Sequence, residues 1–226
     1  MKDSIFITGG SHGIGRELAR VFADRGHRVV IHGRNRERLK KLRDELAGRG
    51  GTCGVVVGDI RGGRTEKNIL AALKKYDISI FVNNAGVAGE GSIWRISVPE
   101  IREALETNLV APINITKRIY PFFRKKGGGI IVNINSIAGL EAQTARPVYC
   151  ATKWGLRGFT LALGEEAKKD NIRIVGVYPS RVRTRPEFTY GMEPRELAEK
   201  VYHCVMRTKK TECIVDNRPK KYKKYG

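Results

Sequence analysis

The chain has 226 residues, of which 41% are hydrophobic, so a single domain can bury a substantial core without disulfides or bound metal. It contains no run of about eighteen apolar residues, and the apolar run at residues 5–7 is too short for a signal-peptide core, so we expect a soluble, cytoplasmic protein that does not enter membranes. Lys and Arg number 43 against 23 Asp and Glu, a net charge of +20, which favours contact with polyanions but, without a nucleic-acid-reading motif, does not indicate specific nucleic-acid binding.

Short β-rich runs alternate with longer helix-like segments along the whole chain, which predicts a parallel sheet with helices on both faces. The predicted strands are residues 4–8, 28–32, 54–57, 78–83, 129–135, 172–178 and 212–215. The predicted helices are residues 14–25, 36–47, 65–75, 99–109, 113–125, 148–169 and 194–207. Gly26, Gly48 and Asn171 stand just where such helices commonly end.

No repeat, linker or low-complexity tract interrupts this alternation. The pattern therefore predicts an α/β fold, a doubly wound, Rossmann-type parallel sheet of seven strands in a single domain spanning residues 1–226. Sheets of this kind bind ligands beyond the carboxyl ends of their strands. The four cysteines have neither CxxC nor Cys/His ligand spacing, which predicts reduced thiols and no metal site.

The first predicted strand leads into a glycine-rich turn, TGGSHGIG at residues 8–15, and then into an amphipathic helix. Glycines let the backbone approach a pyrophosphate, and the helix N-terminus supplies N–H donors and positive potential. A tight strand-to-helix connection also uses glycines, but the end of the first strand is where such sheets bind nucleotides. The candidate cofactor-binding residues of this turn are Gly9, Ser11, His12, Gly13, Ile14 and Gly15.

The second predicted strand is followed by Arg34, and no acidic residue stands where an NAD-type site would hold the ribose 2′-hydroxyl. A planar guanidinium suits a 2′-phosphate, so the local chemistry favours NADP(H) as the cofactor. Ser11 and His12 could add hydrogen bonds to that phosphate. In the alternative interpretation, Arg34 only begins the exposed face of the following helix.

Tyr149 and Lys153 are four residues apart in a predicted helix, so their side chains share one face. A free tyrosine has a pKa of about 10, and a nearby ammonium group lowers it by stabilising the phenolate. Tyr149 could then act as general acid in carbonyl reduction and as general base in alcohol oxidation. Ser136 could donate a hydrogen bond to the substrate oxygen. Taken singly, each residue also fits an ordinary cap or an exposed helical pair.

Taken together, these motifs resemble the short-chain dehydrogenase/reductase family. The resemblance is carried by the TGxxxGxG turn, by NNAG at residues 83–86, by Asn108, by Ser136 thirteen residues before Tyr149, by the YxxxK pair, and by PSRVRT at residues 179–184. It covers nearly the whole chain. It implies an oxidoreductase that transfers hydride between NADP(H) and a carbonyl/alcohol pair of a small molecule, and it does not name the substrate.

The resemblance also implies roles for further residues. Asn108 would keep a water for proton relay to Lys153, which would also hold the ribose hydroxyls. Asp59 and Ile60 would flank the adenine. The residues that would contact the adenosine ribose and the nicotinamide are Asn83, Ala85, Gly86, Pro179 and Thr184. Ser180 replaces the family's usual glycine, and serine rarely adopts the backbone angles open to glycine.

Substrate choice should depend on the loops after Gly86, Ser136 and Thr184. Their mostly apolar candidates are Val87, Ala88, Trp94, Ile137, Leu140, Gln143, Pro186, Phe188 and Tyr190. Only eight residues separate Thr184 from Glu193, so we expect an open mouth, compatible with a small ketone, a sugar or a long thioester. The alternatives are a 3-oxoacyl thioester (acyl-carrier-protein) reductase, a catalytically silent NADP(H)-binding sensor, and a polyanion-binding protein using the basic stretch at residues 207–226.

The family resemblance further implies a homo-oligomer, a dimer or tetramer, in which helices near residues 113–125 and 148–169 pair across subunits. Trp154, Phe159 and Leu163 would suit such an interface. Ordinary core packing explains these apolar side chains equally well.

Overall fold

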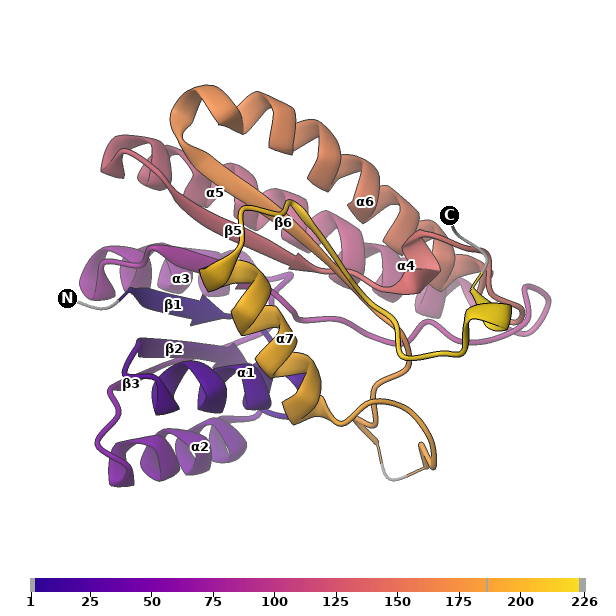
Figure 1. The fold of residues 1–226 in the computed structure, drawn as a ribbon, viewed down its shortest axis with the longest axis horizontal. Helices are drawn as coiled ribbons and strands as arrows, with labels where there is room; N and C mark the ends of the chain where they lie inside the picture. The colour runs from indigo at the N-terminus through magenta and orange to yellow at the C-terminus, as the bar shows by residue number, and fades with distance from the viewer. Residues whose placement is uncertain (1–2, 186, 224–226) are drawn as a thin grey trace.

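The computed structural model of the protein describes residues 3–185 and 187–223. Within these residues, seven parallel strands form one sheet in the order β3-β2-β1-β4-β5-β6-β7 (Figure 1). The strands are β1 Ser4–Ile7, β2 Arg28–Gly33, β3 Cys53–Val57, β4 Ile80–Asn83, β5 Gly129–Ile134, β6 Ile172–Pro179 and β7 Glu212–Val215. The strand order reverses direction between β1 and β4, as in doubly wound sheets. The predicted fold class is confirmed.

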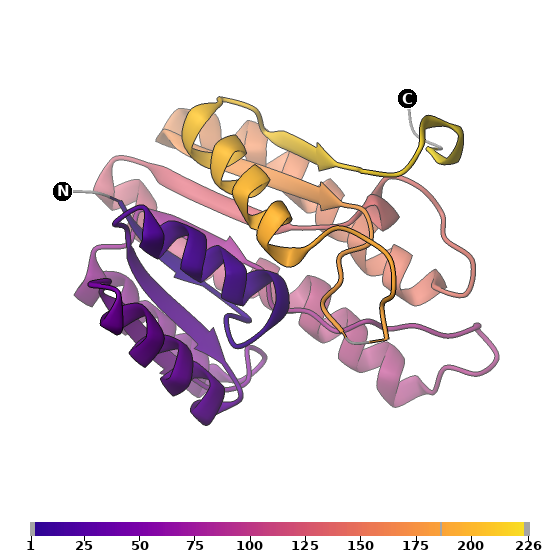
Figure 2. The same ribbon diagram turned by 60° about the horizontal axis from the view of Figure 1, so that its bottom comes forward.

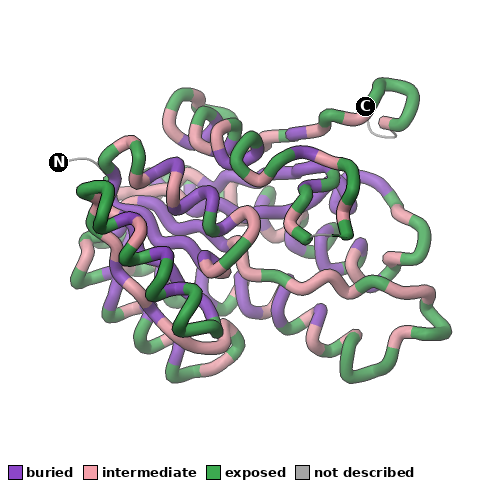
Figure 3. Tube along the Cα trace, turned by 90° about the horizontal axis from the view of Figure 1, so that it is seen from below, coloured by how far each residue is buried: buried purple, intermediate pink, exposed green. Residues whose placement is uncertain are grey.

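Helices cover both faces of the sheet, as Figures 1 and 2 show. The α-helices are α1 Gly13–Asp24, α2 Arg36–Gly48, α3 Gly63–Tyr76, α4 Val98–Leu105, α5 Ala111–Lys126, α6 Pro147–Ala167 and α7 Pro194–Arg207. One core cluster packs α1, α2 and α7 against the sheet, and a second packs α3, α5 and α6 against its other face. Figure 3 shows the buried strands between the two helical layers. The fold therefore leaves the carboxyl edge of the sheet for a ligand.

Most predicted boundaries differ from the observed ones by one or two residues, and α7 and β7 have the predicted bounds. Gly26 (φ +79°) and Asn171 (φ +54°) end helices in the left-handed conformation, as predicted. The prediction for Gly48 is wrong, because α2 includes Gly48 and the left-handed residue is Gly50 (φ +77°). The fourth strand begins at Ile80 rather than at residue 78, because the Ile78 N–H still bonds to the Leu73 carbonyl of α3.

The helices predicted at residues 99–109 and 113–125 are joined in the structure. A π-helical turn, Glu106–Val110, links α4 directly to α5 and contains Asn108. Pro112 falls in the first turn of α5, directly after the π-helical turn. π-helical turns are rare and often occur at functional sites. The sequence pattern does not distinguish this turn from a helix break.

A buried network of amide and hydroxyl groups ties the central strands to the helices behind them. Asn133 of β5 is fully buried, and its Nδ2 donates to Thr160 Oγ1 of α6 at 2.9 Å. Its Oδ1 accepts a hydrogen bond from Asn83 Nδ2 of β4 at 2.9 Å, and the same amide of Asn83 also contacts Thr116 of α5. Because a buried polar group without a partner is costly, the network fixes β4 and β5 relative to α5 and α6.

We expect Asn133→Ala to lower the free energy of unfolding by about 1–3 kcal/mol, because it leaves Asn83 and Thr160 without this buried partner. Asn114→Ala, on the exposed face of α5, is the matched control and should change stability by less than about 0.5 kcal/mol. Chemical denaturation of the three proteins measures both values. Equal stability of the two variants would contradict the role given to the network.

Candidate active site

A cavity of about 1070 Å³ opens along the carboxyl edge of the sheet, where β1, β2, β4, β5 and β6 end. It brings together most of the residues singled out from the sequence: Gly9, Ser11, His12, Gly13, Ile14, Arg34, Asp59, Ile60, Ala85, Gly86, Asn108, Ser136, Tyr149, Lys153, Pro179 and Thr184. The structure does not bring Gly15 or Asn83 to the cavity. Gly15 packs inside the turn, and Asn83 belongs to the buried network that joins β4 and β5 to α5 and α6.

The glycine turn is shaped by close backbone contacts. Gly13 has a left-handed φ of +53°, which glycine adopts more readily than residues with a Cβ. A Cβ on Gly15 would lie 2.3 Å from the Gly9 carbonyl oxygen, so Gly15 is needed for packing rather than for approach to a ligand. Asn84, part of the NNAG motif but without a predicted role, donates from Nδ2 to the Thr8 carbonyl at 2.8 Å. It joins the glycine turn to the end of β4 and lines the cavity next to Ala85.

The N-terminus of α1 faces this cavity without a capping side chain. His12 occupies the N-cap position, and in the described part of the chain no side-chain hydrogen bond caps the helix. The first-turn N–H groups of a helix need acceptors, and they carry the positive end of the helix dipole. The donor set therefore fits the pyrophosphate of a dinucleotide.

Positive charge gathers beside the glycine turn, near the end of β2. Burial lowers the pKa of His12, and the charges of nearby arginines lower it further, so this imidazole is neutral near pH 7. These arginines are Arg38, Arg16, Arg34 and Arg185. The accumulated charge fits an anionic group such as a 2′-phosphate.

Asp59 also reaches this end of the cavity, where its carboxylate pairs with Arg61 at 2.6 Å. The hydrogen bond from Arg61 lowers the pKa of Asp59 to about 2, against a smaller opposing effect of burial. Asp59 is therefore ionised at neutral pH, and Arg61 offsets its charge. Because of this pairing, the negative charge of Asp59 does not cancel the positive potential around Arg34.

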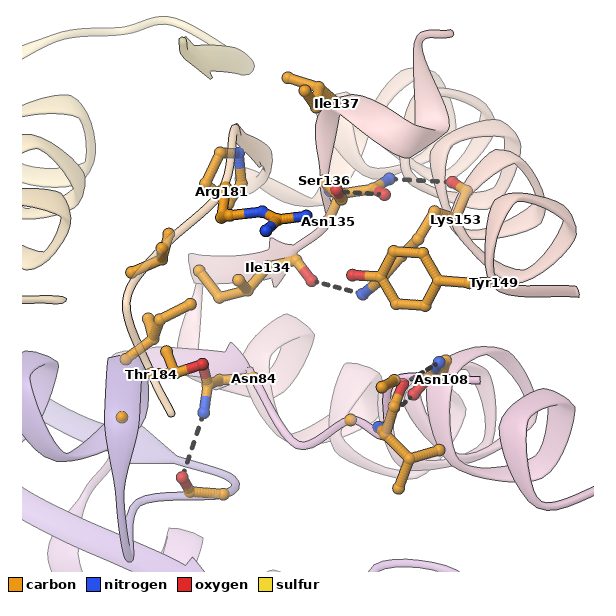
Figure 4. Close-up of a pocket in the computed structure, with 18 of the residues that line it drawn as sticks. Asn84, Asn108, Ile134, Asn135, Ser136, Ile137, Tyr149, Lys153, Arg181 and Thr184 are labelled. Carbon is orange, nitrogen blue, oxygen red and sulfur yellow. Dashed lines mark hydrogen bonds between the residues drawn. The ribbon is translucent and has the colours of Figure 1, made fainter. Parts of the chain in front are cut away.

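Tyr149 and Lys153 lie on one face of α6, as predicted, and both project into the cavity with Ser136 (Figure 4). The Lys153 Nζ atom is 5.6 Å from the centroid of the Tyr149 ring. It donates a hydrogen bond to the Ile134 carbonyl of β5 at 3.0 Å. Asn135, the next residue, donates from Nδ2 to the Lys153 carbonyl at 3.1 Å and accepts from the Ser136 N–H at 2.9 Å. Asn135 was not predicted, yet it joins Ser136 to Lys153.

Arg146 supplies a positive charge that acts on Tyr149 in this structure. Burial raises the pKa of Tyr149, while the Arg146 guanidinium and a hydrogen bond with Ser136 lower it. The Arg146 Cζ atom lies 4.3 Å from the centre of the Tyr149 ring. Burial, followed by the charge of Arg146, lowers the pKa of Lys153 to about 8. The sequence pattern indicated Lys153 as the cation near Tyr149 and gave no sign of this contact of Arg146.

Asn108 is buried in the π-helical turn and holds the loop that follows Gly86. Its Oδ1 accepts from the Val87 N–H at 2.8 Å, and its Nδ2 donates to the Val87 carbonyl at 2.9 Å. The side-chain amide is thus occupied by a two-bond contact with the backbone. A water held by Asn108 for proton relay stays a prediction.

Ser180 fits the end of β6 without strain, because it is absent from the described non-glycine residues with left-handed φ. Its hydroxyl donates to Asn217 Oδ1 at 2.8 Å. The C-terminal segment, residues 216–223, thereby lies along the cavity, where Asn217 and Arg218 form part of the wall. Arg218 pairs with Glu141 of the loop after β5 at 2.6 Å and with Asp216 at 2.9 Å. Nothing in the sequence pattern indicated that this segment returns to the site.

The three expected substrate loops contribute unequally to the cavity. The residues that line it are Val87, Ala88, Ile137, Gln143, Phe188 and Tyr190. Trp94 and Leu140 do not line it, since Trp94 is 78% exposed to solvent and Leu140 packs with Ile137 in a small core cluster. Pro186 lies outside the described residues.

The four cysteines are all free thiols. In residues 3–185 and 187–223, no group of three or more His, Cys, Asp or Glu side chains is arranged to hold a metal ion. No helix in this part of the chain is long and apolar enough to span a bilayer.

Comparison with known proteins agrees with this geometry. The family model described as short chain dehydrogenase matches residues 3–189. Oxidoreductase UcpA of Salmonella typhimurium is 34% identical over 181 residues, which are 79% of this chain and 68% of that protein. The 3-oxoacyl-[acyl-carrier-protein] reductase FabG of Chlamydia muridarum is 33% identical over 189 residues, which are 82% of this chain and 75% of that protein.

Solved structures show the same fold over nearly the whole chain. A bulky-bulky ketone specific alcohol dehydrogenase from Comamonas testosteroni superimposes with a TM-score of 0.87 at 27% identity, covering 94% of this chain and 86% of that one. A short-chain dehydrogenase from Sphingobium yanoikuyae, in complex with NADPH, gives a TM-score of 0.86 at 26% identity, covering 95% and 87%.

The lowered pKa of Lys153 predicts how stability changes with pH in the cofactor-free protein. Its pKa is about 8 in the folded state against an ordinary value of 10.5, so between these values the unfolded chain binds more protons. Lys153 therefore makes stability rise with pH through this window. Denaturation curves of the wild type and of Lys153→Met from pH 7 to 11 measure the effect. A wild-type slope no steeper than that of the variant would contradict the assignment.

Proposed function

The chain belongs to the short-chain dehydrogenase family of oxidoreductases, and we propose that it transfers hydride between NADP(H) and a carbonyl/alcohol pair of a small molecule. The observation that carries this proposal is the meeting of Ser136, Tyr149 and Lys153 in the same cavity as the uncapped glycine turn. The turn supplies a dinucleotide site, and the three side chains supply proton transfer beside it.

In carbonyl reduction, Tyr149 donates its phenolic proton to the substrate oxygen, and Ser136 donates a hydrogen bond to the same oxygen. The phenolate that remains on Tyr149 is stabilised by the positive charges of Arg146 and Lys153. In alcohol oxidation the phenolate takes the proton back. When bound, the nicotinamide ring supplies or accepts the hydride.

In this proposal, different residues of the chain bind different parts of NADP(H). The N–H groups at the start of α1 hold the pyrophosphate, and Arg34 with Ser11 and His12 holds the 2′-phosphate. Lys153 holds the ribose hydroxyls next to the nicotinamide. The remaining contacts follow the family pattern, with Asp59 and Ile60 at the adenine, Ala85 and Gly86 at the adenosine ribose, and Pro179 and Thr184 at the nicotinamide. NADPH is bound in several similar solved structures.

A second candidate is reduction of a 3-oxoacyl thioester carried on an acidic protein. It is supported by the likeness to the reductase of Chlamydia muridarum, by the net charge of +20 and by the short connection between β6 and α7. A catalytically silent NADP(H)-binding sensor is less well supported, because such a protein would have no use for the complete group of Ser136, Tyr149, Lys153 and Asn108.

We also propose that the protein works as a homo-oligomer. Trp154 and Leu161 lie on the outer side of α6 and are 48% and 41% exposed. Exposed apolar side chains on one helix face suit contact with a second copy of the chain. Phe159 and Leu163 are partly buried, and Leu163 packs against the core of its own subunit.

We expect Tyr149→Phe to abolish turnover, a loss of at least about 100-fold in kcat, because it removes the hydroxyl that exchanges the proton with the substrate oxygen. Binding of NADPH, followed by its fluorescence, should stay within about twofold, because the ring remains. Tyr120→Phe removes the same hydroxyl from α5, where it bonds to Asp170, and should keep activity. Wild-type rates in Tyr149→Phe would rule out the mechanism.

Arg34→Met should weaken NADPH binding by roughly 10- to 100-fold and leave NADH binding nearly unchanged, because one charge-assisted contact to the 2′-phosphate is lost. Arg36→Met removes the same charge from the exposed start of α2 and is the matched control. Titration of each protein with both cofactors separates a 2′-phosphate contact from general electrostatic attraction. Equal losses in the two variants would favour the second explanation.

A further inference from the structure

We call the part of the cavity beyond Ser136, lined by the loops after β4, β5 and β6 and by the C-terminal segment, the substrate half. Some of its arginines are paired with carboxylates of the described residues, and one is not. Arg146 pairs with Glu90 at 2.9 Å. Arg218 pairs with Glu141 and Asp216. Arg181 also lines the cavity, but it forms no ion pair with any carboxylate of the described residues. The substrate half therefore contains one guanidinium whose charge has no such partner among residues 3–185 and 187–223.

Arg181 is placed beside the reacting groups. It follows Ser180 directly after β6, at the same edge of the sheet as Ser136. Figure 4 shows its guanidinium reaching across the cavity toward Asn135 and Ser136, on the side opposite the Tyr149 ring. An anionic group bound there would be a neighbour of the carbonyl oxygen that Ser136 and Tyr149 hold.

Two aromatic rings of the same loop contact this side chain. The Arg181 Cζ atom lies 4.4 Å from the centroid of the Tyr190 ring and 5.2 Å from that of Phe188. Such contacts use the face of the guanidinium, so its in-plane N–H groups stay available, and among the described residues these donate no hydrogen bond. A guanidinium ordered in this way loses less conformational freedom when it binds an anion.

We propose that Arg181 binds an anionic group of the substrate, so that the enzyme acts on a carbonyl compound carrying a carboxylate or a phosphate a few bonds from the reacting carbon. The planar N–H fork of arginine matches both groups through paired hydrogen bonds. This assignment rests on the proposed hydride transfer and names the substrate class for that same cavity.

The test compares matched substrates that differ in charge. Acetoacetate is set against methyl acetoacetate, and dihydroxyacetone phosphate against dihydroxyacetone, with NADPH consumption as the readout. Arg181→Met should lower kcat/KM for the anionic member of the productive pair by roughly 10- to 100-fold, mainly through KM. The neutral member and the Kd of NADPH should change by less than about twofold. The two pairs show whether a carboxylate or a phosphate is preferred.

Arg183→Met is the matched control. Arg183 lies two residues further along the same loop, pairs with Glu193 and does not line the cavity. The same change of charge there should leave the preference for anionic substrates unaltered. An equal loss in Arg183→Met, or a wild-type enzyme that reduces the neutral members as well as the anionic ones, would overturn the role of Arg181. Failure of the wild type to reduce any carbonyl compound would instead count against the proposed function.

Discussion

The geometry of the candidate site depends on how α6 is fixed to the end of β5. Two hydrogen bonds connect them through one helical residue, since Asn135 donates to the Lys153 carbonyl and the Lys153 ammonium donates to the Ile134 carbonyl. These groups are buried, so a shift of the helix along the strand would leave polar atoms without partners. Tyr149 is one turn from Lys153, and Ser136 directly follows Asn135. The same contacts that pack the helix therefore set the position of Tyr149 relative to Ser136.

Charge divides the cavity into two regions with different chemistry. Near the glycine turn, arginines gather around a neutral His12, which favours a phosphate. Beyond Ser136, Arg146 and Arg218 are paired with carboxylates that also connect separate loops. The second region thus gains order from its ion pairs and has one guanidinium, that of Arg181, without such a pair among the described residues, whereas several arginines lie together in the first. A net charge of +20 alone could not have shown this difference.

Local and periodic features of the sequence predicted the strands, the helices and most of the cavity lining. Tyr149 and Lys153 could be placed on one face because helical spacing alone determines it. Contacts between residues far apart in the chain produce no periodic pattern in the sequence, so they could not be predicted from it. The hydrogen bond from Asn135 to the Lys153 carbonyl of α6 and the ion pair of Arg146 with Glu90 depend on tertiary packing. Asn83 and Asn84 illustrate the limit, because adjacent residues at a strand end point in different directions, and only the structure shows which one reaches the cavity.

Ser180 replaces the glycine of the family pattern, and a residue far away in the sequence accommodates its side chain. Its backbone needs no glycine conformation, and its hydroxyl bonds to Asn217, which lies 37 residues later. The bond brings the C-terminal segment against the cavity, where Asn217 and Arg218 form part of the wall. Arg218 then joins this segment to the loop containing Glu141. The family model ends at residue 189, so this part of the wall lies beyond what family membership describes. The wall of the cavity is therefore formed in part by residues that the shared motifs do not include.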